Sequence, residues 1–493
     1  MARTLMFQGT GSDVGKSTIV AGLCRWFSQQ GLRVRPFKPQ NMSNNAAVTR
    51  EGGEIGRAQA LQALACGVAP SVHMNPVLLK PESDTRCQVV VQGHVKGTWQ
   101  AAGYQEHKAS LMPAVLDSFA QLQAEADLIL VEGAGSPAET NLRAGDIANM
   151  GFATAAHVPV CLVADIDRGG VIASVVGTHT VLSGDDRGRI AGYLINKFRG
   201  DPRLFDEGLQ HITRHTQWPS FGVLPWQSAV ARLPSEDAVV LEHPREDLFT
   251  ARPYVVAVPM LSRIANFDDL DPLRAEPAVR VVMVPPGQPL PQDADLILIP
   301  GTKATIADLD FMRAQGWDID VLAHARHGKA IIGVCGGYQM LGQWVRDPLG
   351  LEGPPRVSAG LSLLNVDTTL APHKILRDTS GHCAWLDAPV QGYEIHAGRT
   401  DGADTQRPML QLDGGVNEGA RNEAGTVMGT YLHGLFTHDA FRDSFLRHMA
   451  GHGSRLRAGF ATTVQGALDE LAAAIGTCID TDGLWAASAS HRT

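Results

Sequence analysis

The sequence predicts an α/β protein with two domains, the first of which is doubly wound around a parallel sheet. Short apolar runs alternate with helix-like stretches over residues 1–230 and again over residues 252–445. Runs that are apolar almost throughout are typical of strands buried on both faces of a parallel sheet. Each run in the first domain is followed by polar, often glycine-rich residues, and ligands of such sheets bind beyond the carboxyl ends of the strands.

The length of 493 residues exceeds one ordinary hydrophobic core, which favours two or three domains. Charge and proline content rise after the first α/β series, which indicates a linker before the second series begins. We therefore predict a first domain over residues 1–230, a linker over 231–251, a second domain over 252–445 and a helical C-terminal tail over 446–493.

Composition excludes several classes of protein. The net charge of −9 gives no electrostatic reason to expect nucleic-acid or membrane binding. The N-terminus has no signal-peptide core, and no run of about 18 apolar residues indicates a membrane span. The seven cysteines are scattered and lack CxxC spacing, which argues against disulfides or a zinc site and predicts a reducing, cytoplasmic location.

Ten runs are predicted to be strands of the two parallel sheets. Those of the first domain are residues 5–7, 32–37, 126–131, 158–164, 190–195 and 221–224, and those of the second are 254–260, 279–284, 295–299 and 329–334. Later runs around Leu361, Gly392 and Val427 favour antiparallel strands. Helix-like residues are expected over 19–29, over 338–345 and, in the tail, over 464–475.

The stretch GTGSDVGKST, residues 9–18, lies between the first strand and the first helix. A glycine-rich turn before a helix presents backbone N–H groups to phosphate oxygens, so this context predicts a phosphate-binding loop. Lys16 is expected to reach the β- and γ-phosphates of ATP, and the Ser17 hydroxyl to hold Mg²⁺. The usual spacing has glycine where this chain has Thr10, so the loop is a variant, and an ordinary turn before a helix is the alternative. The ATP-binding candidates in this loop are Thr10, Gly11, Asp13, Val14, Gly15, Lys16, Ser17 and Thr18.

Two charged residues at strand ends extend this site. Glu132 ends the third strand, where a carboxylate facing a phosphate loop is a candidate Mg²⁺ ligand, directly or through water. Lys38 ends the second strand, where a cation would neutralise a phosphate or a developing acyl phosphate. The alternatives are a solvated strand-end acid and a surface lysine.

Amide side chains form a further group of candidates. Gln40, Asn41 and Asn44 follow the second strand in an amide-rich loop that suits a polar, carboxylate-bearing substrate, although asparagine is also common in turns. Asn196 follows the fifth strand, where an amide is able to read an adenine edge.

In the second domain, an apolar strand runs into Cys335 within GVCGGYQMLG. Small neighbours permit the strained turn of a nucleophile elbow, and the following helix favours a negatively charged sulfur. The backbone N–H of Gly336 is then placed for an oxyanion hole, and Gly301 in IPGTKAT is the candidate for a second donor. His433 in GTYLHGLF is the predicted base, and a buried structural thiol is the alternative role of the cysteine.

These residues resemble two known families joined in one chain. The elbow cysteine, the proline-glycine loop and the late histidine resemble a class I glutamine amidotransferase domain. The stretch GTGSDVGKST with EGAG downstream is similar to the dethiobiotin synthetase-like ATP-dependent ligases. The two are fused in the cobyrinic acid amidating enzymes, and motifs of that family occur here in order from Met6 to about His433. They are PFKPQNMSNNA, MNPVLLKP, VEGAGSPAE, ADIDRGG, LINKFRGD, GVLPW, SRIANFDDLDPL, PGTKATIADL, GVCGGYQMLG and GYEIHAGRT.

The resemblance implies a glutamine-hydrolysing, ATP-dependent carbon–nitrogen ligase. Glutamine is expected to be hydrolysed through a thioester at Cys335, with ammonia passing to a corrin carboxylate activated as an acyl phosphate. The PFKPQNM loop implies the b, d, e and g carboxylates of adenosylcobyrinic acid a,c-diamide as substrates and adenosylcobyric acid, a cobalamin precursor, as product. The expected ligands are ATP, Mg²⁺, glutamine and the corrin, with no nucleic acid and with the oligomeric state left open.

One departure concerns the third member of the catalytic triad. Many class I amidotransferases place a glutamate two residues after the histidine, and this chain has Leu435 there. Either a Cys–His dyad suffices or another group orients His433, with Glu394 as a candidate and His396 as an alternative base.

Two other functions remain as alternatives. One is a P-loop partitioning or regulatory ATPase with an inactive amidotransferase domain, against which the Cys335 elbow argues. The other is an amidotransferase-ligase for a different polycarboxylate, such as the a,c-diamidation of cobyrinic acid or a cell-wall precursor.

Overall fold

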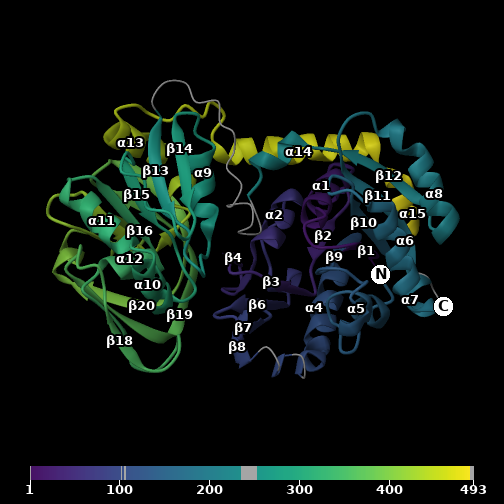
Figure 1. The fold of residues 1–493 in the computed structure, drawn as a ribbon, viewed down its shortest axis with the longest axis horizontal. Helices are drawn as coiled ribbons and strands as arrows, with labels where there is room; N and C mark the ends of the chain where they lie inside the picture. Colours follow the sequence, from purple (N-terminus) through teal and green to yellow (C-terminus); the bar gives the residue numbers. More distant parts are fainter. Residues whose placement is uncertain (1, 101–102, 105–106, 235–252, 489–493) are drawn as a thin grey trace.

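The computed structural model describes residues 2–100, 103–104, 107–234 and 253–488, which form two lobes (Figure 1). The N-terminal lobe lies on the right of the view and the C-terminal lobe on the left, with the long helix α14 (Phe460–Cys478) running along the top between them. Most of the predicted linker and the last residues of the predicted tail fall outside the described residues.

The N-terminal lobe is built on a six-stranded parallel sheet of order β12-β11-β10-β1-β9-β2. Its strands are β1 (Arg3–Gly9), β2 (Val34–Phe37), β9 (Leu128–Glu132), β10 (Val160–Asp165), β11 (Ile190–Phe198) and β12 (Ser220–Pro225). All six predicted strands are confirmed. The central strand β1 leads into the phosphate loop, so the loop lies at the carboxyl edge of the sheet, where neighbouring strands also end.

Helices cover both faces of this sheet, as expected for a doubly wound fold. Alternate residues of β1 face opposite cores: Met6 contributes to the core under α4, α5, α6 and α8, and Leu5 and Phe7 to the core under α1 and α14. The helices of this lobe are α1 (Lys16–Gln29), α2 (Arg57–Ala65), α4 (Met112–Glu125), α5 (Met150–Ala155), α6 (Val171–Val181), α7 (Gly184–Arg187) and α8 (Asp206–Thr216).

The C-terminal tail contributes to the core of the first lobe. The buried side of α14 includes Leu471 and Ile475, which lie against Gly22 of α1, where a Cβ would meet Ile475 at 2.4 Å. The short helix α15 (Thr481–Ala487) continues on the same lobe. The predicted tail therefore packs as part of the first lobe, and α13 (Asp439–Ala450) crosses the predicted boundary at residue 446.

A second, smaller sheet in this lobe was not predicted. It has the order β3-β6-β7-β8, and a hairpin of β4 and β5 lies near it. The bounds are β3 (Gln40–Met42), β4 (Ala46–Val48), β5 (Glu54–Gly56), β6 (Val77–Pro81), β7 (Arg86–Val91) and β8 (His94–Gln100). It begins in the amide-rich loop and so carries Gln40 and Asn41, whereas Asn44 lies between β3 and β4.

The C-terminal lobe is built on a sheet of order β14-β13-β15-β16-β24-β23, parallel except at its edge strand β23. The bounds are β13 (Tyr254–Pro259), β14 (Val279–Val284), β15 (Leu296–Ile299), β16 (Ala330–Val334), β23 (Ala420–Arg421) and β24 (Val427–Thr430). The four predicted strands are confirmed. The antiparallel prediction for Val427 is wrong in part, because β24 pairs in parallel with β16 and is antiparallel only to β23.

A second sheet of the C-terminal lobe is antiparallel except where β17 pairs in parallel with β19. It contains the long hairpin of β19 (Val366–Cys383) and β20 (Ala388–Gly402), which confirms the expectation around Gly392. The other strands are β17 (Trp344–Asp347), β18 (Arg356–Ala359), β21 (Leu410–Leu412), β22 (Val416–Glu418) and β25 (Leu432–His433). Leu361 itself lies between strands.

The helices of the second lobe are α9 (Asp271–Arg274), α10 (Thr305–Ala314), α11 (Trp317–Arg326) and α12 (Gly336–Leu341), in addition to α13. The helix after the elbow is shorter than predicted. It ends at Leu341, and Trp344 and Val345 instead pair with neighbouring strands in β17.

Candidate active sites

Cys335 stands in a strained turn between β16 and α12, with φ of 51° and ψ of −108°. A positive φ is uncommon for a residue with a side chain and is found at functional turns that the surrounding structure holds in place. The glycines after the cysteine permit this turn, because a Cβ on Gly337 would lie 2.1 Å from the Ile299 carbonyl oxygen. The predicted strand–cysteine–helix elbow is therefore present.

His433 lies at the end of β25 and is buried, with Asp269 beside it. The Nδ1 atom of His433 is 2.8 Å from Oδ2 of Asp269, and the other carboxylate oxygen accepts the backbone N–H of Gly434 at 2.6 Å. Burial alone lowers the pKa of His433, but the Asp269 carboxylate and a hydrogen bond with Cys335 raise it to about 10. The arrangement therefore favours a protonated imidazole beside the sulfur, with Asp269 orienting the ring.

The sequence analysis did not identify Asp269 as the acid that orients His433. The residues it named, Glu394 and His396, make other contacts. Glu394 makes an ion pair with Arg377 at 2.5 Å and approaches His396 at 3.5 Å, so it does not orient His433. His396 stacks on Tyr431, and its Nδ1 is 3.0 Å from the Gly398 carbonyl oxygen. The acid that orients His433 is therefore Asp269, the second of two adjacent aspartates in SRIANFDDLDPL. It lies 164 residues before the histidine in the sequence.

The predicted oxyanion residue Gly336 lies against the loop that contains Gly301. A Cβ on Gly336 would be 3.2 Å from the Thr302 nitrogen, and a Cβ on Gly301 would be 2.9 Å from Cε1 of His433. The Gly301 carbonyl accepts from Ala265 N at 2.9 Å, which fixes the loop. Gly336 is the first residue of α12, where backbone N–H groups lack intrahelical partners. The amides of Gly336 and of the 301–302 loop therefore border the elbow together.

The phosphate loop wraps around the start of α1. Gly15 has φ of 93°, and a Cβ there would collide with the Asn196 side chain at 2.3 Å. The Asn196 Nδ2 donates to the Val14 carbonyl at 2.8 Å, so this amide fastens the loop. Lys16 is buried, and its Nζ lies 3.3 Å from the carbonyl oxygens of Gly11 and Gly135.

Glu132 is the centre of a buried polar cluster next to the loop. Its Oε1 atom accepts from the Ser17 hydroxyl at 2.8 Å and from Lys38 Nζ at 2.8 Å, and Gln62 donates to Oε2 at 2.6 Å. Lys38 is therefore buried at this cluster and is not a surface lysine. The hydroxyl and carboxylate oxygens are the donors that Mg²⁺ prefers, and the remaining positions would come from water and phosphate. Among the described residues, no group of three or more His, Cys, Asp or Glu side chains forms a metal site.

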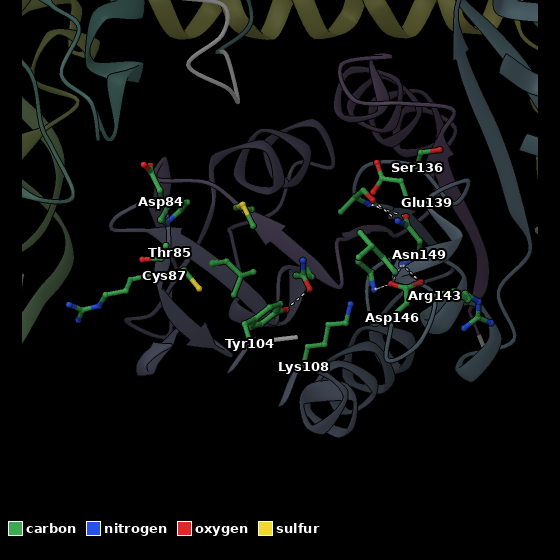
Figure 2. A pocket seen from close by; sticks show the side chains of 18 of the residues that line it. Asp84, Thr85, Cys87, Tyr104, Lys108, Ser136, Glu139, Arg143, Asp146 and Asn149 are labelled. Carbon is green, nitrogen blue, oxygen red and sulfur yellow. Dashed lines mark hydrogen bonds between the residues drawn. The ribbon is translucent and has the colours of Figure 1, made fainter. Parts of the chain in front are cut away.

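Gln40 and Asn41 lie on β3 near this cluster. Tyr104 donates a hydrogen bond to the Gln40 side chain, and Gln40 lines a cavity of about 500 Å³ between the small sheet and the 134–150 segment. Asn41 is buried, and its amide donates to Gln59 at 3.1 Å, so it supports the site from within the protein. Figure 2 shows the cavity, with Lys108 and Tyr104 pointing into it from one side and Asp146 and Asn149 on the other.

A second cavity, of about 280 Å³, is shared by the two lobes. Cys335 and His433 line it from the second lobe, and Asn44 and Lys80 line it from the first. Asn44 Oδ1 is buried and has no hydrogen-bond partner within the part of the chain that the structure describes. The elbow cysteine and the amide-rich loop, 291 residues apart in the sequence, therefore face the same space.

The site and fold define an ATP-dependent ligase joined to a glutamine amidotransferase. Residues 5–240 match the CobQ/CobB/MinD/ParA nucleotide binding domain, and residues 255–441 match the CobB/CobQ-like glutamine amidotransferase domain. The chain is 59% identical over 486 residues to the cobyric acid synthases of Brucella suis biovar 1 and Brucella canis, covering 99% of this chain and 100% of each relative. The chain therefore belongs to the cobyric acid synthase family, which confirms the predicted class of enzyme and its place in cobalamin biosynthesis.

Two further findings accompany this assignment. A solved structure of PurLQS from Thermotoga maritima aligns with a TM-score of 0.29 at 16% identity, covering 44% of this chain and 97% of that chain, which is too low a similarity to carry an argument. In the part of the chain that the structure describes, no helix is both long and apolar enough to cross a membrane.

Proposed function

We propose that this enzyme amidates the b, d, e and g carboxylates of adenosylcobyrinic acid a,c-diamide, using ATP and glutamine, to give adenosylcobyric acid. The observation that carries the proposal is the presence of two complete polar sites in one chain. One is the Cys335–His433–Asp269 arrangement, and the other is the phosphate loop with its Glu132 cluster. Family membership supplies the class of reaction, and these residues supply its steps.

Glutamine hydrolysis takes place at the elbow. The Cys335 sulfur attacks the side-chain carboxamide carbon of glutamine, and the resulting oxyanion accepts hydrogen bonds from Gly336 and the 301–302 loop. His433 gives its proton to the departing nitrogen, which leaves as ammonia while a thioester remains on the sulfur. Water, deprotonated by the same imidazole, then releases glutamate, and the buried Asp269 stabilises the ring whenever it carries charge.

Carboxylate activation takes place at the phosphate loop. The loop amides and Lys16 bind the ATP phosphates, and Lys38 lies where it stabilises charge on a phosphoryl group in transfer. A substrate carboxylate oxygen attacks the γ-phosphorus, which forms an acyl phosphate and releases ADP. Mg²⁺ held by Ser17 and Glu132 would offset negative charge on the phosphates. Ammonia then attacks the acyl carbon, and inorganic phosphate leaves.

Ammonia reaches the first lobe through the cavity that both lobes line. Asn44 Oδ1, which has no hydrogen-bond partner among the described residues, is an acceptor for an N–H of ammonia on the first lobe's side of that cavity. Asn44, Asn41 and Gln40 are close in sequence, so the same loop leads from the shared cavity toward the cavity lined by Gln40.

The 500 Å³ cavity is the proposed site for the corrin carboxylate side chains. Lys108 lines it, is 7% exposed, and makes no ion pair within the described residues. Two other cations around the cavity are paired, Arg143 with Asp186 at 2.9 Å and Arg263 with Asp84 at 2.5 Å. Arg86, Glu139 and Asp146 also line the cavity and make no ion pair among the described residues. A buried cation with no ion pair among the described residues favours binding of an anionic group, such as a carboxylate.

We place this chemistry in the cytoplasm. The reaction uses ATP and glutamine, and all seven cysteines are free thiols in the structure, which suits a reducing compartment.

Mass spectrometry of the product tests the proposed function. Purified enzyme is incubated with ATP, Mg²⁺, glutamine and adenosylcobyrinic acid a,c-diamide, and each conversion replaces one OH by NH₂. Four conversions that need both ATP and glutamine support the proposal. An unchanged corrin, with glutamine still hydrolysed, would assign the enzyme to another polycarboxylate.

A further inference from the structure

We infer that Arg57, which belongs to the ATP-binding lobe, is a positioning residue for the glutaminase site in the other lobe. The inference rests on the proposed glutamine hydrolysis at Cys335 and goes beyond it. Arg57 is the first residue of α2 and is not among the residues that line the cavity around Cys335. It acts through two groups that flank the His433–Asp269 pair.

The first group is the carboxylate of Asp268. The Nη2 atom of Arg57 lies 2.7 Å from Oδ2 of Asp268, and both side chains are largely buried. Asp268 is adjacent to Asp269, whose carboxylate holds the His433 ring. A buried ion pair of this kind restricts the backbone on which the neighbouring catalytic acid stands, and removing one partner leaves a buried charge unpaired.

The second group is the ring of Tyr393. The same Nη2 donates to the Tyr393 hydroxyl at 2.5 Å, and the guanidinium carbon lies 4.9 Å from the ring centroid. That ring stacks on the His433 imidazole, with centroids 5.2 Å apart and planes 17° from parallel. Arg57 therefore contacts both the segment that bears the acid and the ring that packs against the base.

Neighbouring residues of the first lobe hold the same segment. Ala46 N donates to the Asn266 side chain at 3.0 Å, and Phe267 N donates to the Asn45 side chain at 3.4 Å. Asn266 has a left-handed conformation, with φ of 52°, and its amide nitrogen lies 3.3 Å from His433 Nε2. The 266–269 segment is thus fastened from the first lobe at its start and by Arg57 at its end.

Helix α2 also reaches the ATP site. Gln62, five residues after Arg57, donates to Glu132 at 2.6 Å, and Gln59 donates to the same carboxylate oxygen at 3.4 Å. Arg57, which positions Asp269, therefore lies on a helix that also makes hydrogen bonds to the phosphate site.

The titratable groups that face Arg57 determine how its loss affects the pH profile. They are Asp268, Asp269, Asp271, Asp378 and Tyr393. Burial raises the pKa of Asp268 and of Asp378 while Arg57 lowers it, so removing the guanidinium raises the pKa of both carboxyl groups. The acid limb of the glutaminase profile is therefore expected to move to higher pH.

The test compares two full-length variants that each remove one contact between the lobes. Arg57→Gln removes the ion pair with Asp268. Glu82→Gln removes an ion pair with Lys303 at 2.9 Å, and neither of those two residues contacts Asp269 or His433. We expect Arg57→Gln to lower glutaminase kcat at least tenfold, with a smaller change in KM and with the acid limb shifted upward. Arg57→Lys, which restores a cation, should recover part of kcat, and Glu82→Gln should behave as wild type.

Amidation with ammonium chloride in place of glutamine reports on the rest of the molecule. It should be retained in Arg57→Gln if the residue positions only the glutaminase. Equal glutaminase loss in Arg57→Gln and Glu82→Gln, an unshifted pH profile, or parallel loss of ammonia-dependent amidation would each overturn the inference. A wild-type enzyme that does not hydrolyse glutamine would instead overturn the proposed function.

Discussion

Asp269 and His433 are 164 residues apart in the chain, yet the Asp269 carboxylate lies 2.8 Å from the Nδ1 atom of the buried imidazole. The acid precedes α9, and the base follows β24 at the carboxyl end of the parallel sheet. This pair supplies the orienting acid that Leu435 does not, so the chain has a Cys–His–Asp arrangement in which the third member comes from the opposite end of the domain.

We expect Asp269→Asn to lower glutaminase kcat by about 10²- to 10⁴-fold, since loss of the orienting carboxylate from a triad leaves the base in the wrong tautomer. Glutamine KM should change little, because the acid does not contact glutamine. Steady-state assay of glutamate release measures the effect, and Glu394→Gln serves as the comparison because Glu394 pairs with Arg377 instead. A dyad would be sufficient if Asp269→Asn retained the wild-type kcat.

The same pair predicts a pH-dependent contribution to folding stability. Asp269 and Cys335 raise the pKa of His433 to about 10 against the opposing effect of burial, whereas an unfolded histidine titrates near 6.5. A group with a raised folded-state pKa stabilises the fold fully below its unfolded pKa, and this stabilisation is lost as pH rises through the folded value. The Tm difference between wild type and Asp269→Asn should therefore be largest near pH 6 and shrink toward pH 10. Differential scanning fluorimetry measures it, and a difference that grows with pH would contradict the charged pair.

The sequence alone was sufficient to predict elements whose characteristic residues lie close together in the chain. Each buried parallel strand is an apolar run followed by a polar loop, so β1, β9, β10 and β16 were recognisable without knowing their neighbours. The phosphate loop and the cysteine elbow were recognisable for the same reason, because glycine spacing and the flanking strand and helix lie within about twenty residues.

Relationships over long sequence distances were not recognisable in this way. The role of Asp269 depends on folding two segments together, and the packing of α14 on α1 depends on a tail that looks like any amphipathic helix. The small sheet was missed because its strands, such as β3 and β8, are short or exposed and lack a continuous apolar pattern. Asn196 was predicted to follow the fifth strand but lies within β11, and its bond to the phosphate loop depends on the tertiary structure.

Replacing the elbow cysteine separates the two half-reactions. Cys335→Ala removes the only proposed nucleophile for glutamine, so glutamine-dependent amidation should fall to background while amidation with ammonium chloride continues. Product mass spectra with each nitrogen source measure both activities. Loss of both would mean that the thiol is needed for packing, which is the role its buried position would otherwise indicate.

Replacing the phosphate-loop lysine should affect both nitrogen sources. Lys16→Ala removes the cation expected at the β- and γ-phosphates, so amidation should fall by several orders of magnitude with glutamine and with ammonia alike. Glutamate release from glutamine should persist, because Cys335 and His433 do not contact this loop. Retained amidation would remove the phosphate loop from carboxylate activation.

Lys108 provides a test of where the corrin binds. It lines the 500 Å³ cavity as a buried lysine, and Figure 2 shows its side chain directed between Tyr104 and Asp146. Lys108→Met keeps the length of the side chain and removes the charge, so the Kd for adenosylcobyrinic acid a,c-diamide should rise about tenfold, as expected when one charge-assisted contact is lost. Titration followed by the corrin absorbance measures it, while the KM for ATP and the rate of glutaminase should remain those of wild type.

The matched control is Lys96→Met, because Lys96 is exposed and lies over the Trp99 ring at 5.9 Å, outside the cavity lining. Equal corrin affinity in the two variants would place the carboxylate elsewhere, whereas wild-type protein that binds no corrin would contradict the proposed substrate itself.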